Sequence, residues 1–183
     1  MAENKRQDII TVPSLQSYFF ESLTEINRNL VHPLPEKALY YSSDVLEKFS
    51  ISSEYFETED GKVREKILGE KFLMATSKSF EEQKRIYKDI GDTSLILCGY
   101  FSDSISKKIV DRSYYKNLGV TAYKRLNSVV PSLLDMPSFF EILAYSFDGL
   151  TQIISEVASR DQSDPQKHLV VDRIIRSYSK KAS

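Results

Sequence analysis

The chain has 183 residues, of which 41% are hydrophobic and 28% are charged, a composition typical of a globular domain with a buried core. Its formal net charge is −1, so it lacks the strong positive field that would attract nucleic acid or an anionic membrane. No apolar run approaches the roughly 18 residues that span a bilayer, and the polar N-terminus lacks the apolar core of a signal peptide. The single cysteine, Cys98, excludes an internal disulfide and indicates a reducing cytoplasm.

The first two predicted helices flank a break that contains prolines. Residues 1–10 are expected to be extended or frayed. A helix is predicted over residues 13–30, where apolar residues recur at spacings of three and four. Residues 32–35 contain two prolines, which end this helix because proline disfavours helical backbone in the residue before it. A second helix is predicted over residues 35–49, with a proline in its first turn.

The following segments lead from a loop to the clearest helix start in the chain. We expect a loop with at most one helical turn over residues 50–61 and a third helix over residues 62–77. Ser79 and Glu82 then form a capping box, in which the serine hydroxyl and the glutamate carboxylate each accept a hydrogen bond from a free backbone N–H. A fourth helix is therefore predicted to begin at this serine.

The segment from Gly91 to Leu126 is expected to lie at the centre of the domain, as two helices joined by a short connector. The fourth helix is predicted to continue through Gly91, because the apolar spacing is maintained across it. The alternative is that Gly91 ends this helix and Asp92 caps a new one. Asp111 is the expected N-cap of the second helix, which we place over residues 114–126.

Small residues in this segment predict a close contact between helices. Gly91 and Gly99 form one strip without side chains, and Gly119 with Ala122 forms another. Such strips let two helices approach more closely than the usual ~8–10 Å. Asp92 borders the first strip, either as a solvated cap or as a buried carboxylate, which would need hydrogen-bond partners. The nearest donors and counter-ions in sequence are Tyr114, Tyr115, Tyr123, Lys88 and Arg125.

Four short motifs follow one another over about residues 88–126: GDTSL, GYF, VDRSYY and GVTAY. Together they resemble the pattern of a family of small bacterial proteins that are all-helical, cytoplasmic and without an assigned activity. The resemblance implies a bacterial, cytoplasmic protein. It gives no catalytic residue that could be transferred to this chain.

Two further helices are predicted after Pro131. Asp135 and Pro137 supply a cap and a first-turn proline for the most hydrophobic helix of the chain, which is expected to end at about Ser159. Residues 161–165 repeat this combination of cap and proline. They start a last, amphipathic helix with a basic end, which suits a helix C-terminus.

We therefore expect one all-α domain over residues 1–183, an irregular bundle of about seven helices. Strand character is limited to residues 9–12 and 94–98, and neither run has a partner with which to pair. No internal repeat, low-complexity segment or interdomain linker divides the sequence.

The sequence contains no set of residues typical of a metal, cofactor or catalytic site. It has two histidines and one cysteine, whereas zinc sites normally use three or four such ligands. Cys98 lies among apolar residues, as a buried, inert thiol does. Residues 91–94 lack the lysine and the preceding strand of a phosphate-binding loop. We expect no metal, no cofactor and no catalytic residue, and we favour a non-enzymatic role.

Four pairs of adjacent aromatic residues suggest a binding surface. Adjacent helical residues point about 100° apart, so one ring of each pair is predicted in the core and the other at its border. Exposed second rings would form a patch for a partner, with Tyr115 or Phe20 as the first candidates. The pairs are Phe19–Phe20, Tyr40–Tyr41, Tyr114–Tyr115 and Phe139–Phe140.

The leading functional hypothesis is a cytoplasmic regulatory or adaptor domain that binds another protein, with a homodimer as one form of such binding. We expect no nucleic-acid partner and no transmembrane segment. One alternative is a small-ligand sensor with a pocket between helices, and another is an enzyme with an Asp/Tyr acid–base site. The candidate interaction or pocket residues are Asp92, Asp111, Tyr114, Tyr115, Tyr123 and Phe20.

Overall fold

Six helices and one short β-hairpin make up the described part of the chain. The computed structural model describes residues 14–50, 56–59, 62–65, 67–102, 112–129 and 138–163. The helices are α1 (Leu15–Arg28), α2 (Glu36–Phe49), α3 (Leu68–Ala75), α4 (Phe80–Gly99), α6 (Arg112–Val129) and α7 (Phe139–Ser163). The antiparallel hairpin pairs β1 (Phe56–Glu59) with β2 (Lys62–Glu65). The predicted all-α class is thereby confirmed, while the expected last helix lies outside the described residues.

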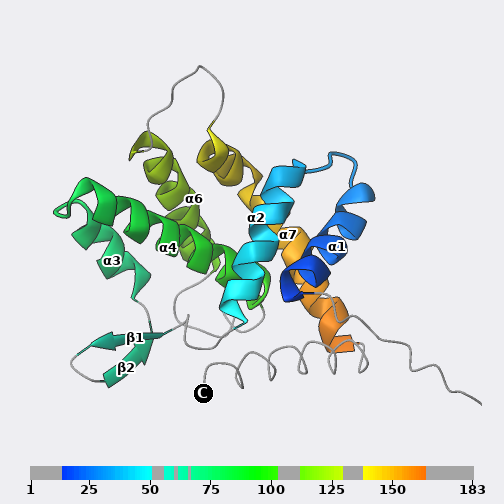
Figure 1. Ribbon diagram of the computed structural model, residues 1–183, viewed down its shortest axis with the longest axis horizontal. Helices are drawn as coiled ribbons and strands as arrows, with labels where there is room; N and C mark the ends of the chain where they lie inside the picture. Colours follow the sequence, from blue (N-terminus) through cyan, green and yellow to red (C-terminus); the bar gives the residue numbers. More distant parts are fainter. Residues whose placement is uncertain are drawn as a thin grey trace, which may run out of the picture.

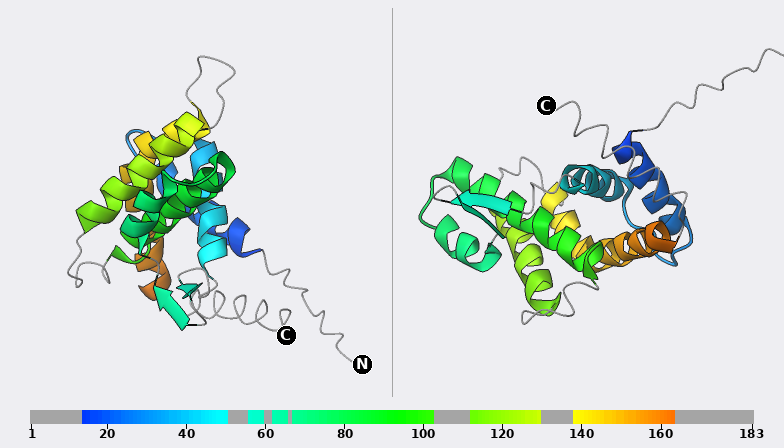
Figure 2. Two further views of the ribbon diagram at one scale, coloured as in Figure 1. Left: turned by 90° about the vertical axis from the view of Figure 1, so that its left-hand side faces the viewer. Right: turned by 90° about the horizontal axis from the view of Figure 1, so that it is seen from below.

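Three helices, α4, α6 and α7, pack against one another at the centre of the bundle (Figure 1). The pair α1 and α2 packs against α7, and α3 packs against α4. Seen from below in Figure 2, α3 and the α1–α2 pair lie at opposite ends of the bundle. The core consequently has a large cluster that involves α1, α2, α4 and α7, and a smaller one beneath α3.

Local hydrogen bonds account for where the helices begin. The N–H of Glu82 donates to Oγ of Ser79 (3.4 Å), and the N–H of Ser79 donates to the Glu82 carboxylate (3.1 Å), so the predicted capping box is confirmed. Ser14 caps α1 in a similar way with its hydroxyl. The amide of Asn27 holds the break before α2, because it accepts from the N–H of Leu34 (2.8 Å) and donates to its carbonyl (3.1 Å).

Three sequence predictions about regular structure are wrong. Residues 62–65 form strand β2 and α3 begins only at Leu68, because the backbone of this segment pairs with β1 instead of continuing a helix. Helix α7 continues to Ser163, past its predicted end. Asp161 lies within it as an acceptor for tyrosine hydroxyls from other elements. Residues 56–59, which lie in the loop predicted over residues 50–61, form strand β1. Residues 94–98 belong to α4, in agreement with the predicted fourth helix.

Helix α4 continues through Gly91 as predicted, and its glycines lie where neighbouring helices approach. A Cβ atom at Gly91 would lie 2.5 Å from a tyrosine ring on α6, and one at Gly99 would lie 2.7 Å from an isoleucine of α7. On α6, a Cβ atom at Gly119 would lie 2.6 Å from Cβ of Ser94. Both strips of small residues therefore face the central helix contacts.

We predict that Gly119→Ala destabilises the protein by at least about 1 kcal/mol relative to Gly149→Ala. Both changes gain the same helix propensity, ~1 kcal/mol. At position 119 the new methyl group meets Cβ of Ser94, which is fixed to the α4 backbone, and such overpacking costs ~1–3 kcal/mol. At position 149 it meets the terminal carbons of Leu34 (2.8 Å), which can rotate away. Urea unfolding of both variants measures the difference, and equal stability would contradict the close α4–α6 contact.

Candidate functional site

The buried carboxylate of Asp92 is the centre of a hydrogen-bond network that joins three helices. Its Oδ1 accepts hydrogen bonds from the hydroxyls of Tyr41 on α2 (2.6 Å) and Tyr123 on α6 (3.0 Å). Its Oδ2 accepts from Nζ of Lys88 (2.6 Å), one turn earlier on α4. The same ammonium group lies 4.9 Å from the centre of the Tyr41 ring, in a cation–π contact. Each carboxylate oxygen therefore has a donor, and the buried charge has a counter-charge.

The two tyrosines of this network stay protonated and act as donors. Burial raises the pKa of both Tyr41 and Tyr123 well above the usual value, and the negative charge of Asp92 raises each pKa further. Both hydroxyls therefore keep the proton that they donate to the carboxylate. Lys88 contributes its positive charge from a position where 42% of its side chain is exposed.

The geometry of this network suits a structural role better than acid–base chemistry on another molecule. Asp92 is completely buried. The rings around it are packed in turn, with Tyr41 5.1 Å from Phe139 and Tyr123 6.5 Å from Phe140 between ring centres. A general base must come within hydrogen-bond reach of the proton that it removes. The hypothesis of an Asp/Tyr enzyme gains no support from this arrangement.

Other residues singled out in the sequence lie apart from this network. Tyr115 is partly buried against both core clusters, and Tyr114 is the more exposed ring of that pair. Phe20 is partly buried on α1, and Asp111 lies outside the described residues. Of the candidate site residues that the structure describes, only Asp92 and Tyr123 therefore lie together in this network.

Sequence reasoning identified one further member of the network and missed another. Lys88 precedes Asp92 by four residues, and this spacing places both side chains on one helix face. Tyr41 is 51 residues away from Asp92 along the chain. Because Tyr41 directly follows Tyr40 in the sequence, we could predict only that one of the two rings points inward. No spacing pattern linked that ring to α4.

A second buried carboxylate, Asp161 near the end of α7, is held in a similar way. One of its oxygens accepts a hydrogen bond from the hydroxyl of Tyr18 on α1, and the other accepts from Tyr100, directly after α4 (3.5 Å). Burial and the charge of Asp161 raise the pKa of Tyr100 to about 12 and raise that of Tyr18 as well. Two tyrosine donors thus accompany each of these two buried aspartates.

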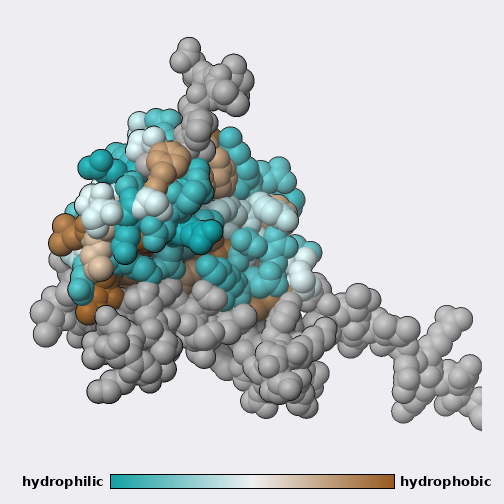
Figure 3. All heavy atoms as spheres, turned by 60° about the vertical axis from the view of Figure 1, so that its left-hand side comes forward, coloured by the Kyte–Doolittle hydropathy of each residue, from teal (hydrophilic) through white to brown (hydrophobic). Residues whose placement is uncertain are grey.

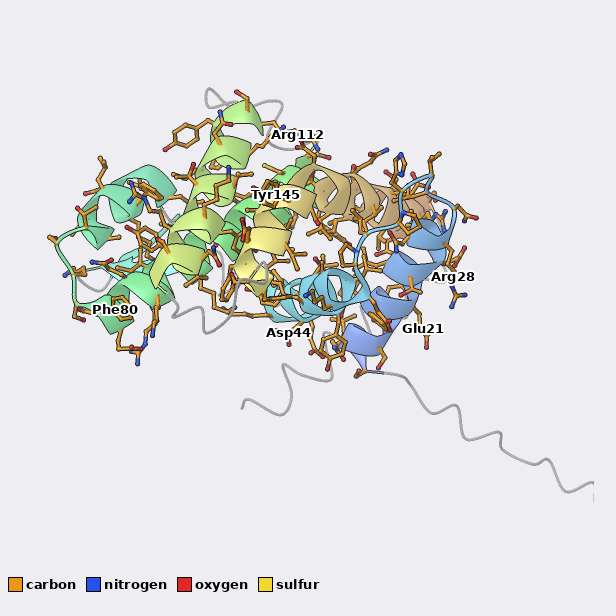
Figure 4. The ribbon with its side chains drawn as sticks, turned by 90° about the horizontal axis from the view of Figure 1, so that it is seen from above. Glu21, Arg28, Asp44, Phe80, Arg112 and Tyr145 are labelled. Carbon is orange, nitrogen blue, oxygen red and sulfur yellow. The ribbon has the colours of Figure 1, made fainter. Side chains whose placement is uncertain are left out.

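A surface groove of about 670 Å³ lies where α1, α2 and the start of α7 meet, and we call it the aromatic groove. Two edge-to-face ring pairs line it: Phe20 with Tyr40 (5.7 Å between centres) and Tyr41 with Phe139 (5.1 Å). Tyr40 is the most open of these rings, with 57% of its surface exposed. The polar residues that line the aromatic groove are Glu36, Lys37 and Asp44, the last of which is labelled in Figure 4.

The coloured part of the face shown in Figure 3 is mainly hydrophilic. On the face shown in Figure 3, hydrophobic side chains form separate small patches rather than one continuous area.

Among the described residues, no group of three or more His, Cys, Asp or Glu side chains could hold a metal ion. Within the same part of the chain, no helix is both long and apolar enough to cross a bilayer. The exposed large apolar side chains on and beside α3 are Ile67, Leu73, Met74 and Phe80.

Comparison with known proteins gives no significant match, whether to protein-family models, to curated protein sequences or to solved structures. The resemblance noted for residues 88–126 is therefore not accompanied by an identified family. Functional inference for this chain depends on its own geometry.

We predict that Asp92→Ala lowers the free energy of unfolding by about 2 kcal/mol or more, because the buried hydroxyls of Tyr41 and Tyr123 lose their acceptor. The matched control is Glu81→Ala on the same helix. Glu81 pairs with Lys84 but has 73% of its side chain exposed, so its loss should cost less than about 1 kcal/mol. Urea unfolding measures both values. Similar losses for the two variants would show that the network contributes little.

We also predict that stability falls as the pH rises above about 10. There the unfolded chain releases its tyrosine protons, whereas the raised pKa values of Tyr18, Tyr41 and Tyr123 keep these residues protonated in the folded state. The folded state then binds more protons, so stability is complete below the ordinary tyrosine pKa and is lost above it. Each such tyrosine contributes a slope of about 1.4 kcal/mol per pH unit. Unfolding measured at several alkaline pH values should show a shallower slope for Tyr41→Phe than for the unaltered protein.

Proposed function

We propose that the protein is a non-enzymatic adaptor or regulatory domain that binds another protein in the aromatic groove. We further propose that the bound segment carries a basic side chain next to an apolar one. The observation that carries this proposal is the composition of the groove, in which four aromatic rings share a surface hollow with carboxylates from α2.

The aromatic rings provide the apolar part of the site. Aromatic residues are enriched in the cores of protein interfaces, because they bury a large area and have few rotatable bonds. Tyr40 is mostly exposed, yet its ring already rests edge-to-face on Phe20. Binding would therefore bury a large side chain without the full entropic cost of immobilising it.

The charges of the groove select for a basic partner. Glu36 and Asp44 outnumber Lys37 among the charged lining residues, which leaves one net negative charge. Aromatic faces also attract cations, as the contact of Lys88 with the ring of Tyr41 demonstrates within the protein itself. An arginine or lysine of the partner would meet both kinds of attraction, whereas an acidic segment would be repelled.

The buried network helps to keep this groove in shape. Tyr41 belongs to both, since its hydroxyl donates to Asp92 while its ring lines the groove. A ring whose position is fixed by packing and by a hydrogen bond offers a preformed surface, and this lowers the cost of binding. The buried network around Asp92 and the capacity of the groove to bind are therefore linked through Tyr41.

A different protein fits this site better than a second copy of the chain. Two-fold symmetric contact between two aromatic grooves would place Glu36 and Asp44 of each chain near the same residues of the other. Such like-charge contacts are unfavourable. In this proposal the protein acts in the bacterial cytoplasm, the compartment implied by the single cysteine and by the resemblance of residues 88–126.

The proposal is tested with a panel of synthetic peptides that alternate basic and apolar residues, and with matching peptides in which glutamate replaces each basic residue. Fluorescence anisotropy should show binding of the basic set alone. Tyr40→Ala should weaken this binding about tenfold or more, because it removes the most exposed ring of the groove. Asp44→Asn should weaken it and reduce its dependence on salt.

Tyr145→Ala is the matched control, because Tyr145 is 75% exposed on α7 but does not line the groove. Neither tyrosine variant should lower the melting temperature appreciably. If basic and acidic peptides bind equally well, or if Tyr145→Ala weakens binding as much as Tyr40→Ala, the groove is not the binding site.

A further inference from the structure

A second hollow, of about 660 Å³, lies between α4, α6 and α7, and we call it the polar cavity. Cys98 of α4 contributes to its wall, with Sγ 3.7 Å from the backbone oxygen of Arg112. One side is formed by the first turns of α6, and the other by residues spaced along one face of α7. Figure 4 shows Arg112 on the side of the bundle opposite Asp44, so the polar cavity and the aromatic groove are separate sites.

Most charges around the polar cavity are already paired within the protein. Lys116 and Asp148 form an ion pair across it (2.7 Å). Glu156 pairs with Arg160 on the following turn of α7 (3.1 Å). Arg160 also contacts Glu25 of α1 (3.2 Å), so Glu156 shares this counter-ion. Each charged lining residue except Arg112 thus has an ion-pair partner among the described residues.

Arg112 is the cation that remains available. Its Nη2 lies 3.4 Å from Oγ1 of Thr151, and among the described residues no carboxylate pairs with its guanidinium group. Burial raises the pKa of Cys98 to about 11, so the thiol is neutral at pH 7 and contributes no negative charge. Within the described part of the chain, Arg112 is therefore the charged lining residue that has no ion-pair partner.

The rest of the lining is rich in neutral polar groups. Thr151 and Ser155 place hydroxyls on the α7 side, and Gln152 adds a side-chain amide. A guanidinium group is planar and binds a carboxylate with two parallel hydrogen bonds. Hydroxyl and amide groups can both donate to and accept from the hydroxyls of a ligand. This combination is typical of a site for a small polar anion.

We propose that the polar cavity binds a small hydroxylated monocarboxylate, with its carboxylate on Arg112 and its hydroxyls toward Thr151, Gln152 and Ser155. One negative charge on the ligand matches the guanidinium group of Arg112, the one charged lining group without an ion-pair partner among the described residues. A phosphate ester would bring additional negative charge close to Asp148 and Glu156, and this would oppose its binding. The proposal rests on residues that the aromatic groove does not use, so each can fail without the other.

Four small probes separate the contributions to binding: glycerate, propionate, glycerol and the larger glycerol 3-phosphate. Because the chain has one cysteine, protein labelled with ¹³C-cysteine gives one reporter signal, from Cys98 in the cavity wall. Titration should move this signal saturably with glycerate. Propionate, which lacks the hydroxyls, and glycerol, which lacks the charge, should both bind more weakly.

Arg112→Gln should weaken glycerate binding about tenfold or more, because it removes a charged hydrogen-bond donor. Arg125→Gln is the matched control, since Arg125 lies exposed on the same helix and does not line the cavity. Gln152→Ala should weaken the binding of glycerate more than that of propionate. Circular dichroism confirms that each variant is folded.

Three outcomes overturn the proposal. The first is the absence of a saturable shift with glycerate, or a shift no stronger than that caused by glycerol. The second is an equal loss of affinity in Arg112→Gln and Arg125→Gln. The third is tighter binding of glycerol 3-phosphate than of glycerate, which would assign the cavity to phosphate esters instead. The comparison of the four probes on the unaltered protein decides the matter even if a variant does not fold.

Discussion

The bundle depends on how it accommodates a negative charge in its centre. A buried carboxylate without partners would cost several kcal/mol, and Asp92 avoids this cost only because α2, α4 and α6 each bring a donor to it. These bonds are directional, whereas the apolar contacts of the surrounding core are not. The network therefore fixes the rotation and relative height of three helices that hydrophobic burial alone would leave less well defined.

The same solution appears again at Asp161, where tyrosines from α1 and from the end of α4 approach a carboxylate of α7. A tyrosine suits this task because its ring belongs to the apolar core while its hydroxyl supplies the donor. The chain has eleven tyrosines and no tryptophan. Together the two aspartates connect five of the six described helices, so they stabilise the arrangement of the bundle as well as its individual contacts.

Local features of the fold could be predicted from the sequence, whereas most contacts between distant segments could not. The capping box at Ser79 depends on neighbouring residues, so its spacing was sufficient. The glycines of α4 indicated a close helix contact because they lack side chains, although their spacing did not identify which helix approaches. The role of Tyr41 depends on how α2 lies against α4, which no local pattern encodes. The extension of α7 past Ser159 has the same cause, because Asp161 is held by tyrosines from other elements and so does not cap a new helix. Likewise, the aromatic groove and the polar cavity each combine residues from three helices.

Helix α4 is connected to both of these sites. Its Asp92 accepts a hydrogen bond from Tyr41 of α2, whose ring lines the aromatic groove, and its Cys98 contributes to the wall of the polar cavity. Coupling between them would require an element with two discrete arrangements. Close packing at Gly91 and Gly99 restricts movement of α4 against α6 and α7, and the bonds to Asp92 oppose its rotation. A ligand in the polar cavity would therefore find α4 already fixed in place. This geometry favours two independent, preformed sites over a switch that passes a signal from one to the other.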